Sequence, residues 1–219
     1  MNITLLCSDV AHPVMPWLQR WAKKMEKKHT VSILNSRNQL AGGDFLFLVS
    51  CSEMISSEYR SLYRHTLVLH ASDLPHGRGW SPHVWELVGG ANHLTLSLLE
   101  AEDKVDSGRI WLKKRIQVSP DALWYEVNEL LFKAEIQLIE EAVENYEDIE
   151  PTVQPSSEGG SYYRRRTPED SEIDASLSLS EQFDLIRMCD PDRYPATFRL
   201  RGKKYRLKLE KADDEDDSH

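Results

Sequence analysis

Short segments rich in apolar residues recur along the chain and predict β-strands. They cover residues 2–8, 30–34, 45–50, 66–70, 94–99 and 110–118, and residues 45–50 are almost continuously apolar. Apolar runs of this length, bounded by polar loops, are typical of strands that are covered on both faces. Six such runs predict one sheet with a substantial core.

Helical periodicity fills most of the gaps between these strands. Apolar residues recur three or four positions apart over residues 13–28, and shorter helices are expected over 57–63 and 84–88. After residue 118, Ser119–Pro120 predicts the start of a long amphipathic helix, because proline is favoured at the first helical position. The alternation of strands and helices indicates an α/β fold with a Rossmann-like, open and mainly parallel sheet.

The pattern changes after this long helix. Residues 148–160 are acidic and then rich in Pro, Ser and Gly, which predicts a linker. Beyond it, a helix is expected near residues 179–188, and a hairpin over 196–200 and 205–209 joined by Arg201–Lys204.

These segments divide the chain into three parts. We expect a main domain over residues 1–150 and a small C-terminal α+β extension over residues 151–212. The acidic residues 213–219 are expected to form a disordered tail.

Charge narrows the choice of partners. The 219 residues hold 27 Lys and Arg against 36 Asp and Glu, a formal net charge of −9. This balance opposes bulk nucleic-acid binding, which needs a cationic surface to displace counterions. Residues 151–212, in contrast, are slightly basic and are suited to an anionic ligand such as a nucleotide diphosphate.

Membrane and metal signals are missing from the sequence. No stretch approaches the roughly 20 apolar residues that span a bilayer, and the first residues lack a cleavable signal pattern. The three cysteines, Cys7, Cys51 and Cys189, are odd in number and lack metal-ligand spacing. We therefore expect a cytoplasmic protein that has no disulfide, binds no metal and does not associate with a membrane.

The candidate chemistry begins at His70. This residue ends a predicted strand and precedes a loop rich in Pro and Gly, and ligands of parallel α/β sheets bind beyond the carboxyl ends of the strands. The sequence has no G-x-G-x-x-G after its first strand and no Walker-type lysine motif. A dinucleotide or P-loop site is therefore not expected.

Five ordered elements around His70 carry a family resemblance. The segment His-Ala-Ser-Asp-Leu-Pro-His-Gly-Arg-Gly-Trp-Ser-Pro spans residues 70–82, a tryptophan follows at residue 85, and Asp-Ser-Gly spans 106–108. Their order and spacing resemble the formyltransferases that use 10-formyltetrahydrofolate. The resemblance implies the formyltransferase fold, with His70 donating to the oxyanion and Asp106 acting as base and holding His70.

The second half of the chain extends this resemblance. Arg-Arg-Thr-Pro-Glu-Asp at residues 165–170 is similar to a segment of formyltransferases that act on nucleotide-linked amino sugars. The short N-formyltransferases of the pseudaminic-acid pathway are the most similar type. The resemblance implies an acceptor held by residues of the extension and of the loop after His70. These residues are Arg78, Tyr162, Arg165 and Arg166.

The same resemblance implies a folate site. The co-substrate would be 10-formyltetrahydrofolate, with Met54 and Ile55 on its apolar side and Asp103 at its polar edge. Its partners would be this folate and a nucleotide-linked amino sugar, and a homodimer is left open.

One position departs from the family pattern. The family's catalytic Asn lies two residues before the His, where this chain has Val68. Loss of such an oxyanion donor typically costs about 10²–10³ in rate. The alternatives are therefore substitution by another donor, a different acceptor such as methionyl-tRNA or a purine precursor, or a catalytically silent protein that binds folate or nucleotide sugars. We favour substitution, because the rest of the motif is intact.

Overall fold

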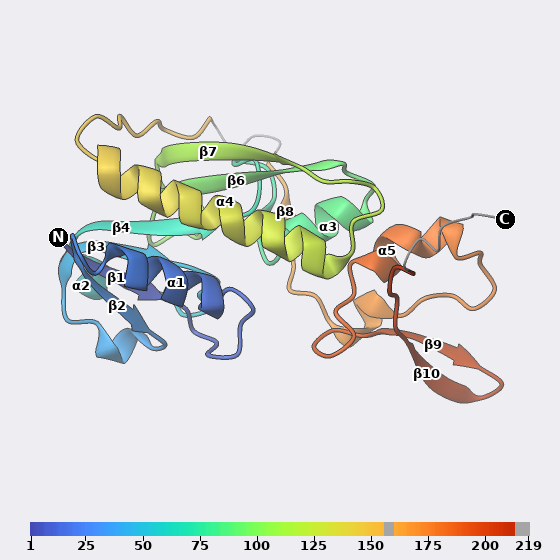
Figure 1. Cartoon of the computed structure of the whole chain (residues 1–219). Coiled ribbons are helices and arrows are strands. Elements are labelled where there is room, and N and C mark those ends of the chain that lie inside the picture. The colour runs from blue at the N-terminus through green and yellow to red at the C-terminus, as the bar shows by residue number, and fades with distance from the viewer. Residues whose placement is uncertain (156–159, 213–219) are drawn as a thin grey trace, which may run out of the picture.

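The fold is organised around a six-stranded sheet in the order β2-β1-β3-β4-β6-β7 (Figure 1). The computed structural model describes residues 1–155 and 160–212. The first four strands in this order are parallel, whereas β6 runs antiparallel to both β4 and β7. The expected mainly parallel α/β sheet is thus confirmed. Its strands are β1 (Asn2–Leu6), β2 (Thr30–Leu34), β3 (Gly43–Leu48), β4 (Tyr63–His70), β6 (His93–Glu100) and β7 (Ile110–Gln117).

Helices α1 (Met15–Met25) and α4 (Trp124–Asn145) lie together over one face of this sheet (Figure 1). The core between them contains fully buried apolar side chains such as Leu5, Phe47 and Val127. The short helices α2 (Ser57–Arg60) and α3 (Pro82–Val88) connect strands. Burial on both faces explains why residues 45–48 of β3 read as a continuous apolar run.

The C-terminal extension contains α5 (Phe183–Arg187) and a hairpin of β9 (Ala196–Leu200) and β10 (Lys203–Leu207). It joins the main sheet through a two-stranded ribbon, in which β5 (Arg78–Gly79) pairs in parallel with β8 (Tyr162–Tyr163). The fully buried Arg187 adds an anchor, because its guanidinium donates to the Ala122 carbonyl at 2.9 Å.

The hairpin turn is shorter than expected. Arg201 and Gly202 alone form it, both at positive φ (49° and 75°), so the second strand begins at Lys203 instead of residue 205. Two-residue turns with positive φ at both positions match the twist of the paired strands. The prediction of a four-residue connection was wrong for this reason.

The start of α4 also differs from the expectation. Pro120 does not occupy the first helical position; the helix begins at Trp124. Ser119 forms a turn instead, since its carbonyl accepts from Ala122 and its hydroxyl bonds to the Asp121 carboxylate. The Glu126 carboxylate then caps the helix by accepting from the Leu123 amide at 2.8 Å.

The expected linker is partly built into the fold. Thr152 pairs with Ile110 at the start of β7 through two backbone hydrogen bonds of 2.8 and 2.9 Å. The division at residue 150 stays a prediction, and the acidic residues 213–219 lie outside the described residues. Within residues 1–155 and 160–212, no helix combines the length and apolar character needed to cross a membrane.

Candidate active site

The structure brings His70 and Asp106 together at the carboxyl end of β4. His70 is the last residue of β4 and is buried, and Asp106 lies in the loop between β6 and β7. The His70 Nδ1 and the Asp106 Oδ1 are 3.5 Å apart, and both side chains are less than a tenth exposed. This distance exceeds the 2.7–2.9 Å typical of a charged hydrogen bond, so both atoms remain able to contact a third group.

The Asp106 loop is held from two sides. Asp106 has a φ of 54°, a left-handed conformation that Asp tolerates better than most residues. Its Oδ2 accepts from the Gly79 amide at 2.8 Å. The Gln154 side chain donates to the carbonyls of Asp106 and Gly108 at 2.9 and 2.8 Å. The carboxylate is therefore fixed, with Oδ1 left facing His70.

The orientation of His70 is set by a backbone carbonyl. The Nε2 atom lies 2.8 Å from the Gly77 carbonyl, which can only accept, so Nε2 carries a proton. The Gly77 amide in turn donates to the Ser161 hydroxyl at 2.8 Å. Gly77 therefore makes the shorter contact with His70, whereas Asp106 was expected to hold it. Nδ1 is the atom left for chemistry.

Val68 lies on the same face of β4 as His70, because side chains alternate along a strand. It packs against Leu74, Leu99 and Ile110 in a small apolar cluster. The position that would hold an amide is therefore part of an apolar floor. A donor for a developing oxyanion must come from another group.

A cavity of about 330 Å³ lies between the Asp106 loop and the β5–β8 ribbon. It carries two cationic side chains, Arg78 and Lys104, from opposite sides. The Arg78 guanidinium donates one hydrogen bond to Gln154 at 2.9 Å, and its buried Nε atom has no partner among the described residues. The residues that line the cavity are Pro75, Arg78, Lys104, Val105, Gly160, Ser161 and Tyr162.

The two tyrosines of β8 have different environments. Tyr163 stacks on Trp85, with ring centroids 6.1 Å apart, and its carbonyl accepts from the Trp80 amide. Tyr162 is 64% exposed and borders the cavity. Tyr162 is thus available to a ligand, whereas Tyr163 supports the ribbon.

Gly79 allows the close approach within this ribbon. Its φ is +98°, and a Cβ atom there would lie 2.3 Å from the Tyr163 carbonyl oxygen. The Gly79→Ala variant is expected to lose about 1–3 kcal/mol of unfolding free energy, as overpacked sites do. Gly90→Ala is the control, because Gly90 has a φ of +88° with nothing within 4 Å. Chemical denaturation of both variants measures the difference; equal losses would contradict a steric role for Gly79.

The three consecutive arginines, Arg164 to Arg166, also have different environments. Arg164 forms two hydrogen bonds with the Asp170 carboxylate, at 2.6 and 2.5 Å, and this interaction lowers the pKa of Asp170. Arg166 is half-buried and donates to the Asp170 carbonyl at 2.9 Å. Arg165 is exposed, with its guanidinium 5.1 Å from the Trp80 ring. Of the two arginines among the predicted acceptor ligands in this run, Arg165 is exposed over the Trp80 ring, and Arg166 is engaged within the extension.

The predicted folate residues lie on two neighbouring loops. Met54 is exposed, whereas the Ile55 side chain is buried in a cluster that Val68 and Ala101 also join. Asp103 lies on the second loop, and its side chain is 82% exposed. Ile55 therefore offers a ligand mainly its backbone.

Metal ligation has no candidate in the part of the chain that the structure describes. Within residues 1–155 and 160–212, no group of three His, Cys, Asp or Glu side chains is placed to hold an ion. Cys7, Cys51 and Cys189 are free thiols.

Four residues of the site had no signal in the sequence. Gln154 and Ser161 fall in and just after the expected linker, Gly77 acts through its carbonyl, and Lys104 is a single charge in a loop. Gly77 lies within the motif at residues 70–82, but its contact with His70 is made by a backbone carbonyl that the motif does not reveal. Gln154 and Ser161 belong to no motif used above, and only the fold brings them beside the site.

Comparison with known families agrees with this geometry. The model for the family described as "Formyl transferase" matches residues 11–143, and that for "Methionyl-tRNA formyltransferase, C-terminal domain" matches residues 168–218. The methionyl-tRNA formyltransferase of Symbiobacterium thermophilum is 25% identical over 173 residues, covering 78% of this chain. The chain spans about half of that relative's length (52%).

Solved structures share the fold along nearly the whole chain. Methionyl-tRNA formyltransferase from Clostridium thermocellum has a TM-score of 0.78 at 22% identity, covering 94% of this chain and 97% of its own. HypX from Aquifex aeolicus in complex with tetrahydrofolic acid has a TM-score of 0.76 at 21% identity, covering 93% of this chain and 36% of its own. A sugar N-formyltransferase from Shewanella sp FDAARGOS_354 has a TM-score of 0.73 at 15% identity, covering 98% and 99%.

The family match covers more than half of the chain and includes β4, the loop after it and the Asp106 loop. The chain therefore belongs to the formyl transferase family.

Proposed function

We propose that this protein transfers a formyl group from 10-formyltetrahydrofolate to the amino group of a nucleotide-linked 4,6-dideoxy amino sugar, with UDP or dTDP as the nucleotide. The observation that carries the proposal is the buried His70–Asp106 pair beside the cationic cavity of about 330 Å³. Membership of the formyl transferase family supports the formyl chemistry. The complex of HypX, a protein of the same fold, with tetrahydrofolic acid supports the donor.

The reaction needs one base and one donor. The acceptor amine attacks the formyl carbon, a C–N bond forms, and the carbonyl oxygen becomes an oxyanion. Asp106 Oδ1 faces His70 at 3.5 Å, a distance that leaves this oxygen able to take the proton that the amine loses. When the intermediate collapses, the bond from the formyl carbon to the folate nitrogen breaks, and this nitrogen receives the proton that Asp106 took from the amine.

His70 supplies the hydrogen-bond donor for the oxyanion, through its Nδ1 atom. Because Nε2 donates its proton to the Gly77 carbonyl, His70 can donate from Nδ1 only when both ring nitrogens carry a proton. The Nδ1 proton then bonds to the oxyanion. This assignment gives His70 the role of the amide that Val68 replaces.

Charge and shape support the choice of acceptor. Arg78 and Lys104 place two cations on the cavity, as a diphosphate requires, and the exposed Tyr162 offers a ring on which a base can stack. The proposed setting is the cytoplasm, and the proposed pathway is the biosynthesis of surface glycans. The proposed type is the N-formyltransferase of the pseudaminic-acid pathway, either as a monomer or as a homodimer.

Methionyl-tRNA is the second candidate acceptor. The match to a methionyl-tRNA formyltransferase C-terminal domain at residues 168–218 favours it. The net charge of −9 opposes it, because tRNA binding needs an extended cationic surface.

The test is a panel of acceptors offered with 10-formyltetrahydrofolate and followed by mass spectrometry. UDP- and dTDP-linked amino sugars, formyl-accepting methionyl-tRNA and a purine-precursor amine are incubated in parallel. The expected result is the mass gain of one formyl group on a nucleotide sugar alone. Formylation of the tRNA would overturn the acceptor assignment, and folate binding without turnover on any amine would indicate a silent protein.

A further inference from the structure

Arg60 connects the two loops on which the predicted folate residues lie. It is the last residue of α2, and its side chain is only 14% exposed. One guanidinium nitrogen donates to the Ile55 carbonyl at 2.7 Å, and another donates to the Asp103 carboxylate at 2.7 Å. A single side chain thus joins the loop after β3 to the loop after β6.

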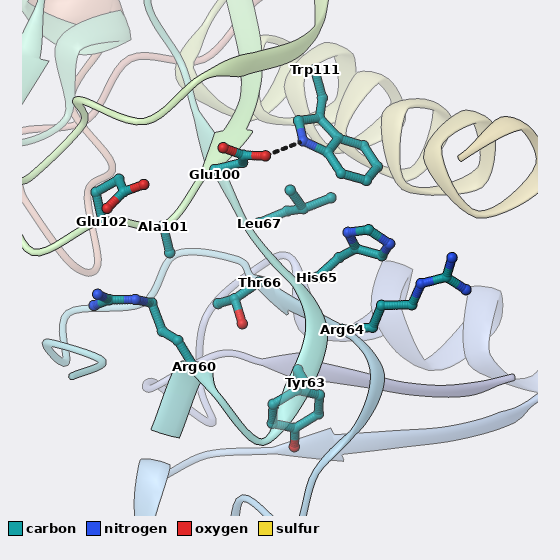
Figure 2. A pocket seen from close by; sticks show the side chains of 10 residues that line it. All are labelled: Arg60, Tyr63, Arg64, His65, Thr66, Leu67, Glu100, Ala101, Glu102 and Trp111. Carbon is teal, nitrogen blue, oxygen red and sulfur yellow. Dashed lines mark hydrogen bonds between the residues drawn. The ribbon is translucent and has the colours of Figure 1, made fainter. Parts of the chain in front are cut away.

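Arg64, the other arginine that lines the cavity beside Arg60, does not make this connection. Arg60 borders a cavity of about 180 Å³ and extends toward the Ala101–Glu102 segment (Figure 2). Arg64 lines the same cavity, but its side chain extends to the other side of β4, where its guanidinium lies 5.0 Å from the Tyr146 ring. A planar guanidinium can donate in two directions at once, which the point charge of lysine does poorly.

The loop after β3 is also held at the Met54 carbonyl, which precedes that of Ile55. Arg37 donates to the Met54 carbonyl at 2.9 Å, so consecutive carbonyls of Met54 and Ile55 each accept from an arginine. Arg37 reaches only this loop and its Glu53, 3.8 Å away. Arg60 is the one that also reaches Asp103, three residues before the catalytic Asp106.

We propose that Arg60 is a positioning residue for the formyl donor, holding the two loops at a fixed separation so that the folate ring system enters a preformed site. The inference rests on the proposed use of 10-formyltetrahydrofolate. Without Arg60 the loops are ordered only when the ligand binds, and this ordering lowers affinity. His70, Asp106 and the acceptor cavity keep their own contacts, so the chemical step is largely retained.

The expected signature is a split between kinetic constants. Arg60→Gln raises the KM for 10-formyltetrahydrofolate and the Kd for tetrahydrofolate about tenfold, with kcat within about twofold and the acceptor KM unchanged. Arg60→Lys, which keeps the charge but not the fork, gives an intermediate increase. Arg64→Gln is the matched control, and it leaves all these constants unchanged.

Direct binding of tetrahydrofolate by titration calorimetry separates this proposal from the proposed function. Binding by the wild type that is unchanged in a folded Arg60→Gln protein overturns the role of Arg60 alone. Equal increases in both KM values also overturn it, because they indicate general disorder. No binding of tetrahydrofolate by the wild type overturns both proposals. Thermal unfolding of each variant identifies those that fold, and Arg60→Lys keeps the test decisive if Arg60→Gln does not.

Discussion

Turnover of the His70→Ala protein is expected to fall by at least about 10²–10³-fold, with little change in KM for either substrate. The His70 imidazole lies 3.5 Å from Asp106, and Val68 offers no second donor on that face of β4. The loss should therefore reach the upper part of this range. Single-turnover formyl transfer, read by mass spectrometry, measures the chemical step directly.

Asp106→Asn is the complementary change in the same experiment. Asn tolerates the left-handed backbone that Asp106 adopts, so the loop keeps its shape, but its amide cannot take the proton of the amine. Loss of a positioned base typically costs 10²–10⁴-fold in rate. His29→Ala, at the opposite end of the sheet before β2, is the control and retains full activity. Undiminished turnover in both site variants would refute the mechanism.

The Glu135→Gln protein is expected to be more stable than the wild type at pH 8, by several kcal/mol. Glu135 lies on α4 with 5% exposure, its Oε2 has no partner among the described residues, and burial raises its pKa from 4.5 to about 8. Between these values the folded protein keeps a proton that the unfolded chain has lost. The free energy of unfolding therefore falls as pH rises through this window, by up to about 1.4 kcal/mol per pH unit.

Urea unfolding at pH 5, 6.5 and 8 measures this slope. Glutamine keeps the shape of a neutral carboxyl, so the variant loses the part of the slope that Glu135 contributes. Burial also raises the pKa of Glu86 to about 7, but this contribution is the same in both proteins and cancels in the comparison. Glu141→Gln, an exposed change on the same helix, should leave the slope intact. An unaltered slope in Glu135→Gln would show that the carboxyl is solvated in the folded state.

The sheet could be predicted from the sequence because buried strands consist mainly of apolar residues. Strands covered on both faces have no polar side to present, and the segment 45–48 is apolar throughout. Individual buried polar residues within a helix were harder to predict. The apolar stripe of α4 was visible in its spacing, and Glu135 falls inside it by position, but its acidic side chain gave no sign that it would be buried there.

The site likewise contains residues that could be predicted from the sequence and contacts that could not. His70 and Asp106 were predicted as a pair from ordered motifs, and in the fold their side chains lie 3.5 Å apart. Their supports act largely through the backbone: Gly77 by its carbonyl, and Gln154 by binding two carbonyls. Any residue has a carbonyl, so such contacts leave no residue-type pattern to read.

The contact between Ser161 and Gly77 bears on the timing of folding during synthesis. The strands and α4 are complete by residue 145, and they can assemble while the rest of the chain is still within the ribosome. Gly77, however, receives its hydroxyl partner only when Ser161 has emerged, and Gly79 receives its neighbouring strand only with Tyr163. The partner of the Gly77 amide therefore leaves the ribosome later than the strands of the main sheet and α4 do.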